Sequence, residues 1–229
     1  MKVTVVEKDL LAALAASRIA EAAERAIAER GIFRWAAAGG GTPRGCYMAL
    51  RAHAVDWTRV ESWLGDERVV PHDHEASNAR MLRTTLLDAV GAPAEKFIPF
   101  DTAIDPDQAA RDAEAKLDGP FDLVLLGLGD DSHTASWFPG TRFSEERLVE
   151  ATPDAHAGYR RITLTPRCVN EAREVLMLVS GAGKSQAIAR VVGKNDDPLN
   201  LPAQRVAPQS GALEWLLDQE AASDLPSTS

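Results

Sequence analysis

The apolar residues of this chain recur in two different patterns. From Asp9 to Arg30 they fall at near-helical spacing with Glu and Arg between them, and Gly31 follows as a candidate C-terminal cap. This pattern predicts a long amphipathic helix that covers a sheet. Four short apolar segments, each soon followed by Gly, are typical of buried strands: Phe33–Ala38, Val60–Leu64, Phe121–Leu126 and Val175–Val179.

Helix-like stretches alternate with these strands. We predict them at Pro43–His53, Asn78–Val90, Pro106–Leu117, Ser185–Val192 and Gly211–Ala222. Crossover connections of this length force neighbouring strands to pair mostly in parallel. The chain therefore predicts an α/β sandwich with its ligand site at the carboxyl ends of the strands.

The 229 residues show no Gly/Ser-rich linker, no internal repeat and no change of composition in mid-chain. We therefore expect one domain over residues 1–222, followed by a frayed tail at 223–229. The hydrophobic fraction of 45% is ample for a core. The longest apolar runs are too short to span a bilayer, so we expect no membrane association.

Charge and cysteine content narrow the range of partners. A net charge of −9 opposes binding to nucleic acid or to an anionic membrane, but it leaves room for a small phosphorylated ligand held by a few local cations. The first residues lack the apolar segment of a secretory signal, so we expect a cytoplasmic protein. Cys46 and Cys168 are expected to be reduced, packed thiols.

The segment Phe121–Pro139 carries the main candidate chemistry, because its apolar run leads into a glycine loop that contains Asp131 and His133. Asp131 can orient the imidazole of His133 and stabilise its protonated form, which suits a general base. The alternative is a structural histidine. The loop has Ser132 where a dinucleotide fingerprint needs its third glycine, which argues against dinucleotide binding.

A glycine loop follows the first predicted strand and offers an anion site. Gly40 and Gly41 let the backbone turn its N–H groups toward a ligand, and Thr42 can cap a helix that Pro43 begins. A plain strand-to-helix turn is the alternative interpretation.

Two cations follow other strands. Arg68 can clamp a phosphate with its planar guanidinium, or it can form a local ion pair with Asp66 and Glu67. Lys184 enters a predicted helix from a glycine turn, where it can hold an anionic group, or it can simply be solvated. The lysine is not part of a nucleotide-binding P-loop, because Leu178 stands where that motif needs glycine.

Two further patterns could suggest a metal site or a serine nucleophile, but neither is supported. His72 and His74 lack a third spaced ligand, so we expect no metal site there. Ser77 suits the N-cap of a helix, and no serine lies in a Gly-x-Ser-x-Gly nucleophile elbow.

As a set, these motifs resemble the 6-phosphogluconolactonase family. The resemblance spans nearly the whole chain and rests on Gly39–Pro43, Asp66–Arg68 with Ser77-Asn78, Gly127–Pro139, Arg161–Thr165, Gly181–Lys184, Leu201-Pro-Ala and a predicted helix at Trp215–Glu220. It implies a single three-layer α/β/α sandwich with a mostly parallel sheet, shared with glucosamine-6-phosphate deaminases. It also implies hydrolysis of 6-phosphogluconolactone without a cofactor, and we expect no metal. The sequence does not distinguish a monomer from a small homo-oligomer.

The resemblance assigns roles to residues of this chain. His133 would be the base and Asp131 its partner, while the substrate and its phosphate would be held by Gly40, Gly41, Thr42, Arg68, Ser136, Arg161 and Lys184. A lactone is an activated ester, so one base and a few donors for the oxyanion suffice.

Departures from the family pattern and two rival functions qualify this interpretation. Ser132 replaces the usual glycine, which predicts a strained backbone, and Trp137 replaces the usual leucine. In the related deaminases a glutamate supports the histidine, and Phe138 takes its place here, which opposes deamination. A sugar-phosphate sensor without catalysis is the other alternative.

Overall fold

The computed structural model describes residues 1–193 and 196–225. Its centre is a six-stranded sheet of order β1-β9-β8-β5-β2-β3, in which every pair of neighbouring strands is parallel. The strands are β1 (Lys2–Val6), β2 (Phe33–Ala37), β3 (Val60–Leu64), β5 (Leu123–Leu126), β8 (Glu174–Val179) and β9 (Ala212–Asp218). The four strands predicted from apolar runs are all present.

The predicted helix at Gly211–Ala222 is wrong. Residues Ala212–Asp218 form β9, which pairs with β8 on one side and β1 on the other. Its consecutive residues Trp215, Leu216 and Leu217 are all buried, as in a strand covered on both faces of a parallel sheet. The helix expected within Trp215–Glu220 is therefore a strand followed by a turn.

Helices fill the connections, close to the predicted positions. They are α1 (Lys8–Arg30), α2 (Gly41–Leu50), α3 (Asn78–Leu82), α4 (Asp88–Val90), α5 (Pro106–Glu114), α6 (Pro166–Asn170) and α7 (Ser185–Val192). A π-helical turn, η2 (Arg83–Leu87), joins α3 to α4. The N–H of Gly31, whose φ is 79°, caps α1 by donating to the carbonyl of Ile27, as predicted.

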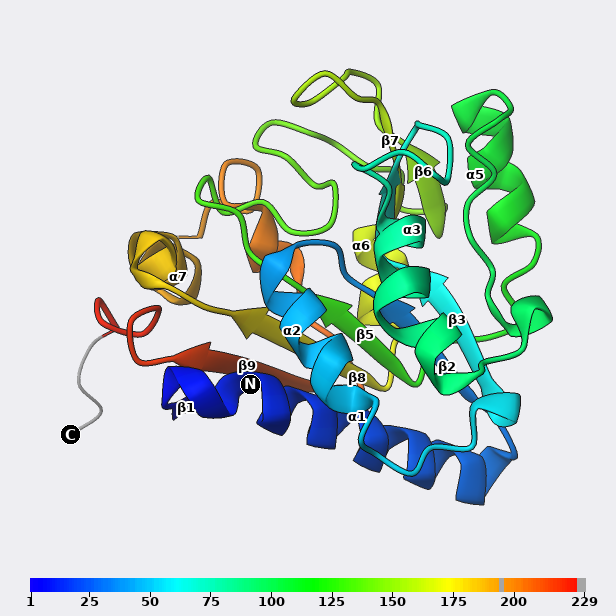
Figure 1. Cartoon of the computed structure of the whole chain (residues 1–229). Helices are drawn as coiled ribbons and strands as arrows, with labels where there is room; N and C mark the ends of the chain where they lie inside the picture. Colours follow the sequence, from blue (N-terminus) through cyan, green and yellow to red (C-terminus); the bar gives the residue numbers. More distant parts are fainter. Residues whose placement is uncertain (194–195, 226–229) are drawn as a thin grey trace.

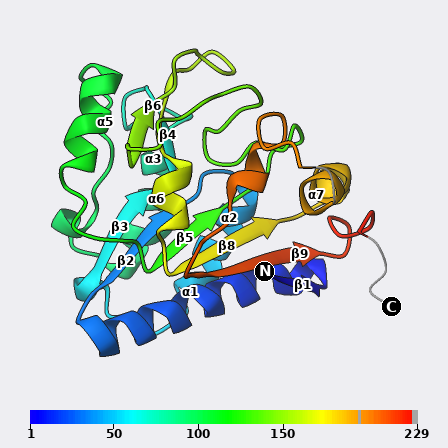
Figure 2. The same cartoon turned by 180° about the vertical axis from the view of Figure 1, so that it is seen from behind.

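Helices cover both faces of the sheet. Figure 1 shows α2 and α3 in front of the strands, whereas the opposite view in Figure 2 shows α6 in front. The buried residues form a hydrophobic cluster that includes Trp35, Trp63 and Phe121, and the rings of the last two meet edge to face. The α/β fold with a mostly parallel central sheet is confirmed.

A small antiparallel sheet of order β4-β7-β6 continues the structure past the carboxyl end of β3. Its strands are β4 (Asp66–Arg68), β6 (Val149–Ala151) and β7 (Arg161–Leu164). The charged residues Asp66–Arg68, which follow the strand predicted at Val60–Leu64, thus form a strand of their own, and Arg68 lies opposite Arg161 of β7. This sheet brings two arginines to the edge where the main strands end.

The order of strands locates a switch point. From β2 the chain moves outward to β3, and it then returns to build β5, β8 and β9 on the other side of β2. The loops after β2 and β5 therefore leave the sheet side by side. In open α/β sheets this crevice is where ligands bind.

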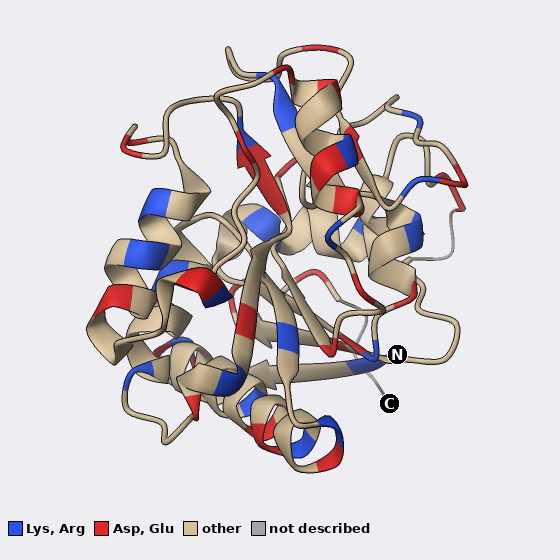
Figure 3. Ribbon diagram, turned by 90° about the vertical axis from the view of Figure 1, so that its right-hand side faces the viewer, with Lys and Arg blue, Asp and Glu red and all other residues tan. Residues whose placement is uncertain are grey.

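Acidic and basic residues are interspersed over the surface helices (Figure 3). Among the described helices, none is long and apolar enough to cross a membrane. Cys46 and Cys168 are free and buried, as predicted, and burial raises the pKa of the Cys46 thiol to about 12.

The first part of the expected tail is packed. Asp224 accepts a hydrogen bond from the hydroxyl of Ser185 at 2.8 Å, and Leu225 lies against the core. Residues 226–229 of the expected tail lie outside the described residues.

Candidate active site

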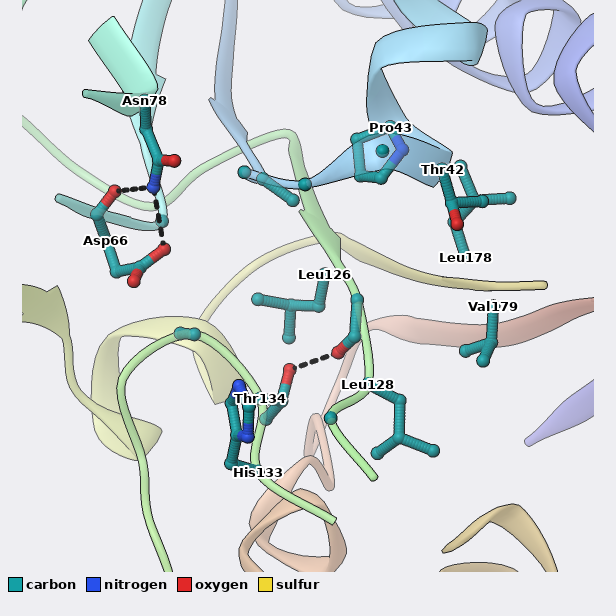
Figure 4. A pocket seen from close by; sticks show the side chains of 18 of the residues that line it. Thr42, Pro43, Asp66, Asn78, Leu126, Leu128, His133, Thr134, Leu178 and Val179 are labelled. Atoms are coloured by element: carbon teal, nitrogen blue, oxygen red, sulfur yellow. Dashed lines mark hydrogen bonds between the residues drawn. The ribbon is translucent and has the colours of Figure 1, made fainter. Parts of the chain in front are cut away.

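A cavity of about 270 Å³ lies at the switch point, lined by loops from both sheets. Figure 4 shows His133 and Thr134 on one side of it, Asp66 and Asn78 on another, and Thr42 and Pro43 on a third. The predicted site residues that line it are Gly40, Gly41, Thr42, Arg68, His133, Arg161 and Lys184. Asp131 and Ser136 do not line the cavity. Each instead contacts a residue that does, namely His133 and Asp66 respectively.

Asp131 and His133 form a close pair. The Nδ1 atom of His133 lies 2.5 Å from Oδ1 of Asp131, and the backbone N–H of His133 donates to the same oxygen at 3.1 Å. Partial burial acts to raise the pKa of Asp131, but these contacts outweigh it and hold the pKa below its usual value. Because Nδ1 is bound to Asp131, Nε2 is the nitrogen left to meet water or substrate.

The loop that carries this pair is a tight turn. The N–H of Gly129 donates to the carbonyl of His133 at 2.7 Å, and the N–H of Ser132 donates to the carbonyl of Gly129 at 3.0 Å. Ser132 is buried and has φ 70°, the left-handed conformation that its replacement of a family glycine predicted. The carbonyl of Ser132 accepts from the N–H of Ala203, which ties the turn to the chain after α7.

The glycine loop after β2 differs from the prediction in one respect. Helix α2 begins at Gly41, and Gly40 with φ 102° is its N-cap, so Thr42 is not the cap and Pro43 is not the first helical residue. The N-cap provides no side-chain hydrogen bond, so the first backbone N–H groups of α2 are not capped by a side chain of that residue. They suit an anion at this end of the cavity.

Arg68 of β4 and Arg161 of β7 lie side by side on neighbouring strands of the small sheet. Arg68 donates from Nη1 to the carbonyl of Ala76 at 2.7 Å, and Arg161 donates from Nη2 to the carbonyl of His156 at 3.3 Å. The Nε atom of each is buried and has no hydrogen-bond partner among the described residues. Burial lowers the pKa of Arg161, and the charge of Arg68 acts in the same direction. Two unsatisfied donors at a cavity favour an anionic ligand.

Glu67 anchors Arg68 and the start of α3. It is fully buried, and its two oxygens accept from the backbone N–H groups of Arg68, Asn78 and Ala79 and from the hydroxyl of Ser77. Burial raises the pKa of Glu67 despite these hydrogen bonds. Ser77 also caps α3, as predicted. The guanidinium of Arg68 donates instead to the carbonyl of Ala76 and to Oδ1 of Asn78, and among the described residues it forms no ion pair with Asp66 or Glu67, so the local ion-pair interpretation is wrong.

Ser136 acts on the site through Asp66. Its hydroxyl is fully buried and donates to Oδ2 of Asp66 at 2.7 Å, while Nδ2 of Asn78 donates to Oδ1 at 3.2 Å. Asp66, unlike Ser136, lines the cavity. Sequence reasoning missed Asp66 and Asn78 as site residues. The polar segments Asp66–Arg68 and Ser77-Asn78 were the signal that could have found them.

Lys184 closes another side of the cavity, but its ammonium is already paired. Nζ lies 2.5 Å from Oδ1 of Asp130, whose side chain is 78% exposed. An ion pair this open to water is weak, so an anionic ligand can compete for the lysine. The preceding turn is fixed by Asp218, which accepts from the N–H of Gly181 and the hydroxyl of Ser180.

The two loop histidines have local roles. Nε2 of His72 contacts the carbonyl of Phe100 at 2.9 Å, and Nδ1 of His74 accepts from the N–H of Ala76 at 3.0 Å. Within residues 1–193 and 196–225, no three His, Cys, Asp or Glu side chains are grouped so that they could hold a metal ion.

Comparison with known proteins places this chain in a family. Residues 6–215 match the model described as glucosamine-6-phosphate isomerases/6-phosphogluconolactonase. The chain belongs to this family. A 6-phosphogluconolactonase of Synechocystis is 42% identical over 214 residues, 88% of each chain, and one of Mycobacterium tuberculosis is 35% identical over 240 residues, 96% of each chain.

Solved structures of the family share the fold. A 6-phosphogluconolactonase from Thermotoga maritima superposes with a TM-score of 0.84 at 28% identity, covering 95% of this chain and 99% of its own. A monomeric glucosamine-6-phosphate deaminase reaches a TM-score of 0.86 at 21% identity, covering 98% of this chain and 100% of its own, which shows the common fold alone. The site residues must therefore decide between the two activities.

Proposed function

We propose that this protein hydrolyses 6-phospho-D-glucono-1,5-lactone to 6-phospho-D-gluconate, a step of the oxidative pentose phosphate pathway. The observation that carries the proposal is the Asp131–His133 pair in one cavity with two arginines whose Nε donors lack acceptors. Relatives named for this activity at 35% and 42% identity support it.

The chemistry requires one base and an oxyanion site. Nε2 of His133 takes a proton from water as the water oxygen attacks the lactone carbonyl, while Asp131 stabilises the imidazolium through Nδ1–H. The tetrahedral intermediate then collapses, the ring C–O bond breaks, and His133 returns its proton to the departing ring oxygen. A guanidinium donor from the small sheet stabilises the oxyanion.

The phosphate holds the substrate in place. Its candidate contacts are the first N–H groups of α2 at Gly41 and Thr42, the arginine of the small sheet that does not serve the oxyanion, and Lys184 once it exchanges Asp130 for the ligand. Binding of the phosphate at one end of the cavity positions the lactone carbonyl at the other end. The free energy of phosphate binding thereby offsets the entropy that is lost when the carbonyl is oriented toward His133.

Two rival functions are less well supported. A deaminase of this fold would need a second acidic group, the glutamate whose place Phe138 takes, whereas the ring of Phe138 lies beside His133 with the ring centroids 5.1 Å apart. A sensor would need the phosphate contacts but not an oriented base, and here the base is held by Asp131 at 2.5 Å.

The deciding experiment uses freshly generated lactone, because it also hydrolyses spontaneously. The purified protein should accelerate hydrolysis well beyond the buffer rate, and His133→Ala should lose about 100-fold or more of that gain. Hydrolysis at the parent rate by His133→Ala contradicts the mechanism. Ammonia release from glucosamine 6-phosphate would instead favour the deaminase, and phosphate binding without turnover would favour the sensor.

We also propose that the enzyme acts in the cytoplasm as one domain, without cofactor or metal, as a monomer or small homo-oligomer. The two buried reduced thiols are consistent with a reducing compartment. Light scattering on a sizing column would give the oligomeric state, and full activity after chelation would support metal independence.

A further inference from the structure

A second histidine lies next to the proposed base, in a ring cluster that the mechanism above does not use. His156, in the chain between β6 and β7, stacks on Phe138 with ring centroids 3.7 Å apart and an interplanar angle of 15°. Phe138 in turn lies 5.1 Å from His133, and the two imidazoles are 6.0 Å apart. The three rings form one compact group although the small sheet and the β5 loop are separate parts of the fold.

The backbone holds His156 firmly in this position. The N–H of His156 donates to the carbonyl of Tyr159 at 2.9 Å, and the N–H of Tyr159 donates back at 3.2 Å. The two residues between them, Ala157 with φ 50° and Gly158 with φ 85°, both have positive φ, as in the tight two-residue hairpin turn. Ala157 adopts this conformation without being glycine, a backbone strain of the kind that gathers at functional sites.

The same residue also contacts the arginine side of the cavity. The carbonyl of His156 accepts from Nη2 of Arg161 at 3.3 Å, and the guanidinium carbon of Arg161 lies 5.6 Å from the ring centre of Phe138. Next along the hairpin, Tyr159 meets His74 edge to face at 6.0 Å. His156 therefore joins the base to the elements that hold the proposed anion contacts.

His133 needs such support. Its side chain is 33% exposed, and among the described residues its ring is hydrogen-bonded at Nδ1 alone, to Asp131. One contact at one nitrogen leaves the ring free to tilt about that contact, and a tilt of the ring moves Nε2 away from the line of attack. Phe138 limits the tilt from one side, and His156 is the ring stacked against Phe138.

We propose that His156 is a positioning residue for lactone hydrolysis, whose imidazole packs Phe138 against His133 and so fixes the direction of Nε2. This inference rests on the proposed function. His156 acts through ring packing and not as a second base, since it reaches His133 only by ring contact.

The electrostatics agree with a packing role. His156 is an exposed residue, but the desolvation that its ring does undergo lowers its pKa, and the neighbouring His133 and Arg161 act in the same direction, while Asp131 opposes them. The ring is therefore held toward its uncharged form, the form in which an imidazole stacks on phenylalanine without adding a charge beside Arg161.

The first test compares two substitutions at His156 with a control on the same hairpin. His156→Ala should lower kcat about tenfold while KM changes by less than about twofold, because the orientation of the base and not the binding of the phosphate is disturbed. His156→Phe keeps a stacking ring and should recover most of the lost kcat. Asp154→Ala, an exposed neighbour, should match the parent. A kcat for His156→Ala equal to the parent's, or no recovery in His156→Phe, would overturn the proposal.

A double-mutant cycle tests the route through Phe138. If His156 acts through that ring, His156→Ala should cost much less kcat in a Phe138→Leu background than in the parent. Equal costs in both backgrounds would show that His156 acts independently and would refute the proposal.

A measurement without turnover separates this inference from the proposed function. Nuclear Overhauser contacts between the ring protons of His133 and Phe138 should be strong in the parent and in Asp154→Ala and should weaken in His156→Ala. If the parent hydrolyses no lactone, the proposed function fails, and these contacts still decide whether His156 positions the base. Unchanged contacts in His156→Ala would overturn the positioning role.

Discussion

Gly129 and His133 approach each other so closely that no side chain fits between them. A Cβ atom on Gly129 would lie 2.0 Å from Nδ1 of His133 and 2.8 Å from Oδ1 of Asp131. The backbone N–H of Gly129 also donates to the carbonyl of His133. The imidazole of His133 can therefore occupy its position only because residue 129 is glycine and carries no Cβ atom.

Gly129→Ala should consequently displace the base without unfolding the protein. We expect kcat to fall about 100-fold, because the imidazole must leave its contact with Asp131. Gly183→Ala is the matched control, since a Cβ there meets nothing within 4 Å. Steady-state kinetics and circular dichroism of both variants check this, and a fully active Gly129→Ala would contradict the geometry.

Asp131→Asn should lower kcat about 100-fold by removing the charge that stabilises the imidazolium. Its effect on stability should depend on pH. The folded protein lowers the pKa of Asp131, so the stabilisation is complete above the unfolded value of about 3.9 and is lost as pH falls through the lower folded value. Urea unfolding at about pH 7 and about pH 3 should show the gap between parent and variant shrinking in acid. A gap that widens in acid would refute the assignment.

Glu67→Gln should destabilise the protein by about 2 kcal/mol, because both oxygens of Glu67 accept from N–H or O–H donors and the new amide would point a donor at them. KM should rise as well, since Arg68 and Asn78 lose their anchor. The exposed Glu75→Gln is the control in the same region. Urea unfolding and kinetics measure both effects, and equal stability of the two variants would contradict the prediction.

Ser132→Gly should be about 1 kcal/mol more stable than Ser132→Ala, because only glycine occupies φ 70° without strain. The comparison removes the hydroxyl in both variants and therefore isolates the backbone. Chemical denaturation gives the difference. An alanine variant as stable as the glycine variant would show that the loop relaxes.

The two thiols should resist reagents in the native protein. Burial raises the pKa of Cys46 to about 12 and also raises that of Cys168, so neither forms the reactive thiolate near neutral pH. A disulfide reagent should modify them only as fast as the protein unfolds. Rapid modification of the folded protein would contradict their burial.

The elements that the sequence predicts well are those whose pattern is local. Strands β2, β3, β5 and β8 have most of their residues buried, so each appears as a short, largely apolar segment. The edge strand β1 buries little and owes its conformation to β9, which lies more than 200 residues away. The short strands of the small sheet likewise depend on partners that no local pattern reveals.

The site residues likewise divide into those that a local sequence pattern predicts and those that depend on distant contacts. The glycine loop, His133 and Lys184 lie directly after strands, so parallel pairing alone brings them to one edge. The positioning of Arg68 by Glu67, and of Asp66 by Ser136, depends on contacts between distant loops. Sequence reasoning therefore assigned Ser136 to the substrate, whereas the structure places it behind Asp66.

The insertion of β9 between β1 and β8 sets an order for biosynthesis. Residues 2–6 are translated before the other described elements, yet their partner strand is translated last among these elements. Asp218, at the end of β9, also fixes the turn before Lys184. The nascent chain can therefore carry its base and its arginines and still lack a finished cavity until β9 has entered the sheet, so activity has to wait for the synthesis of β9.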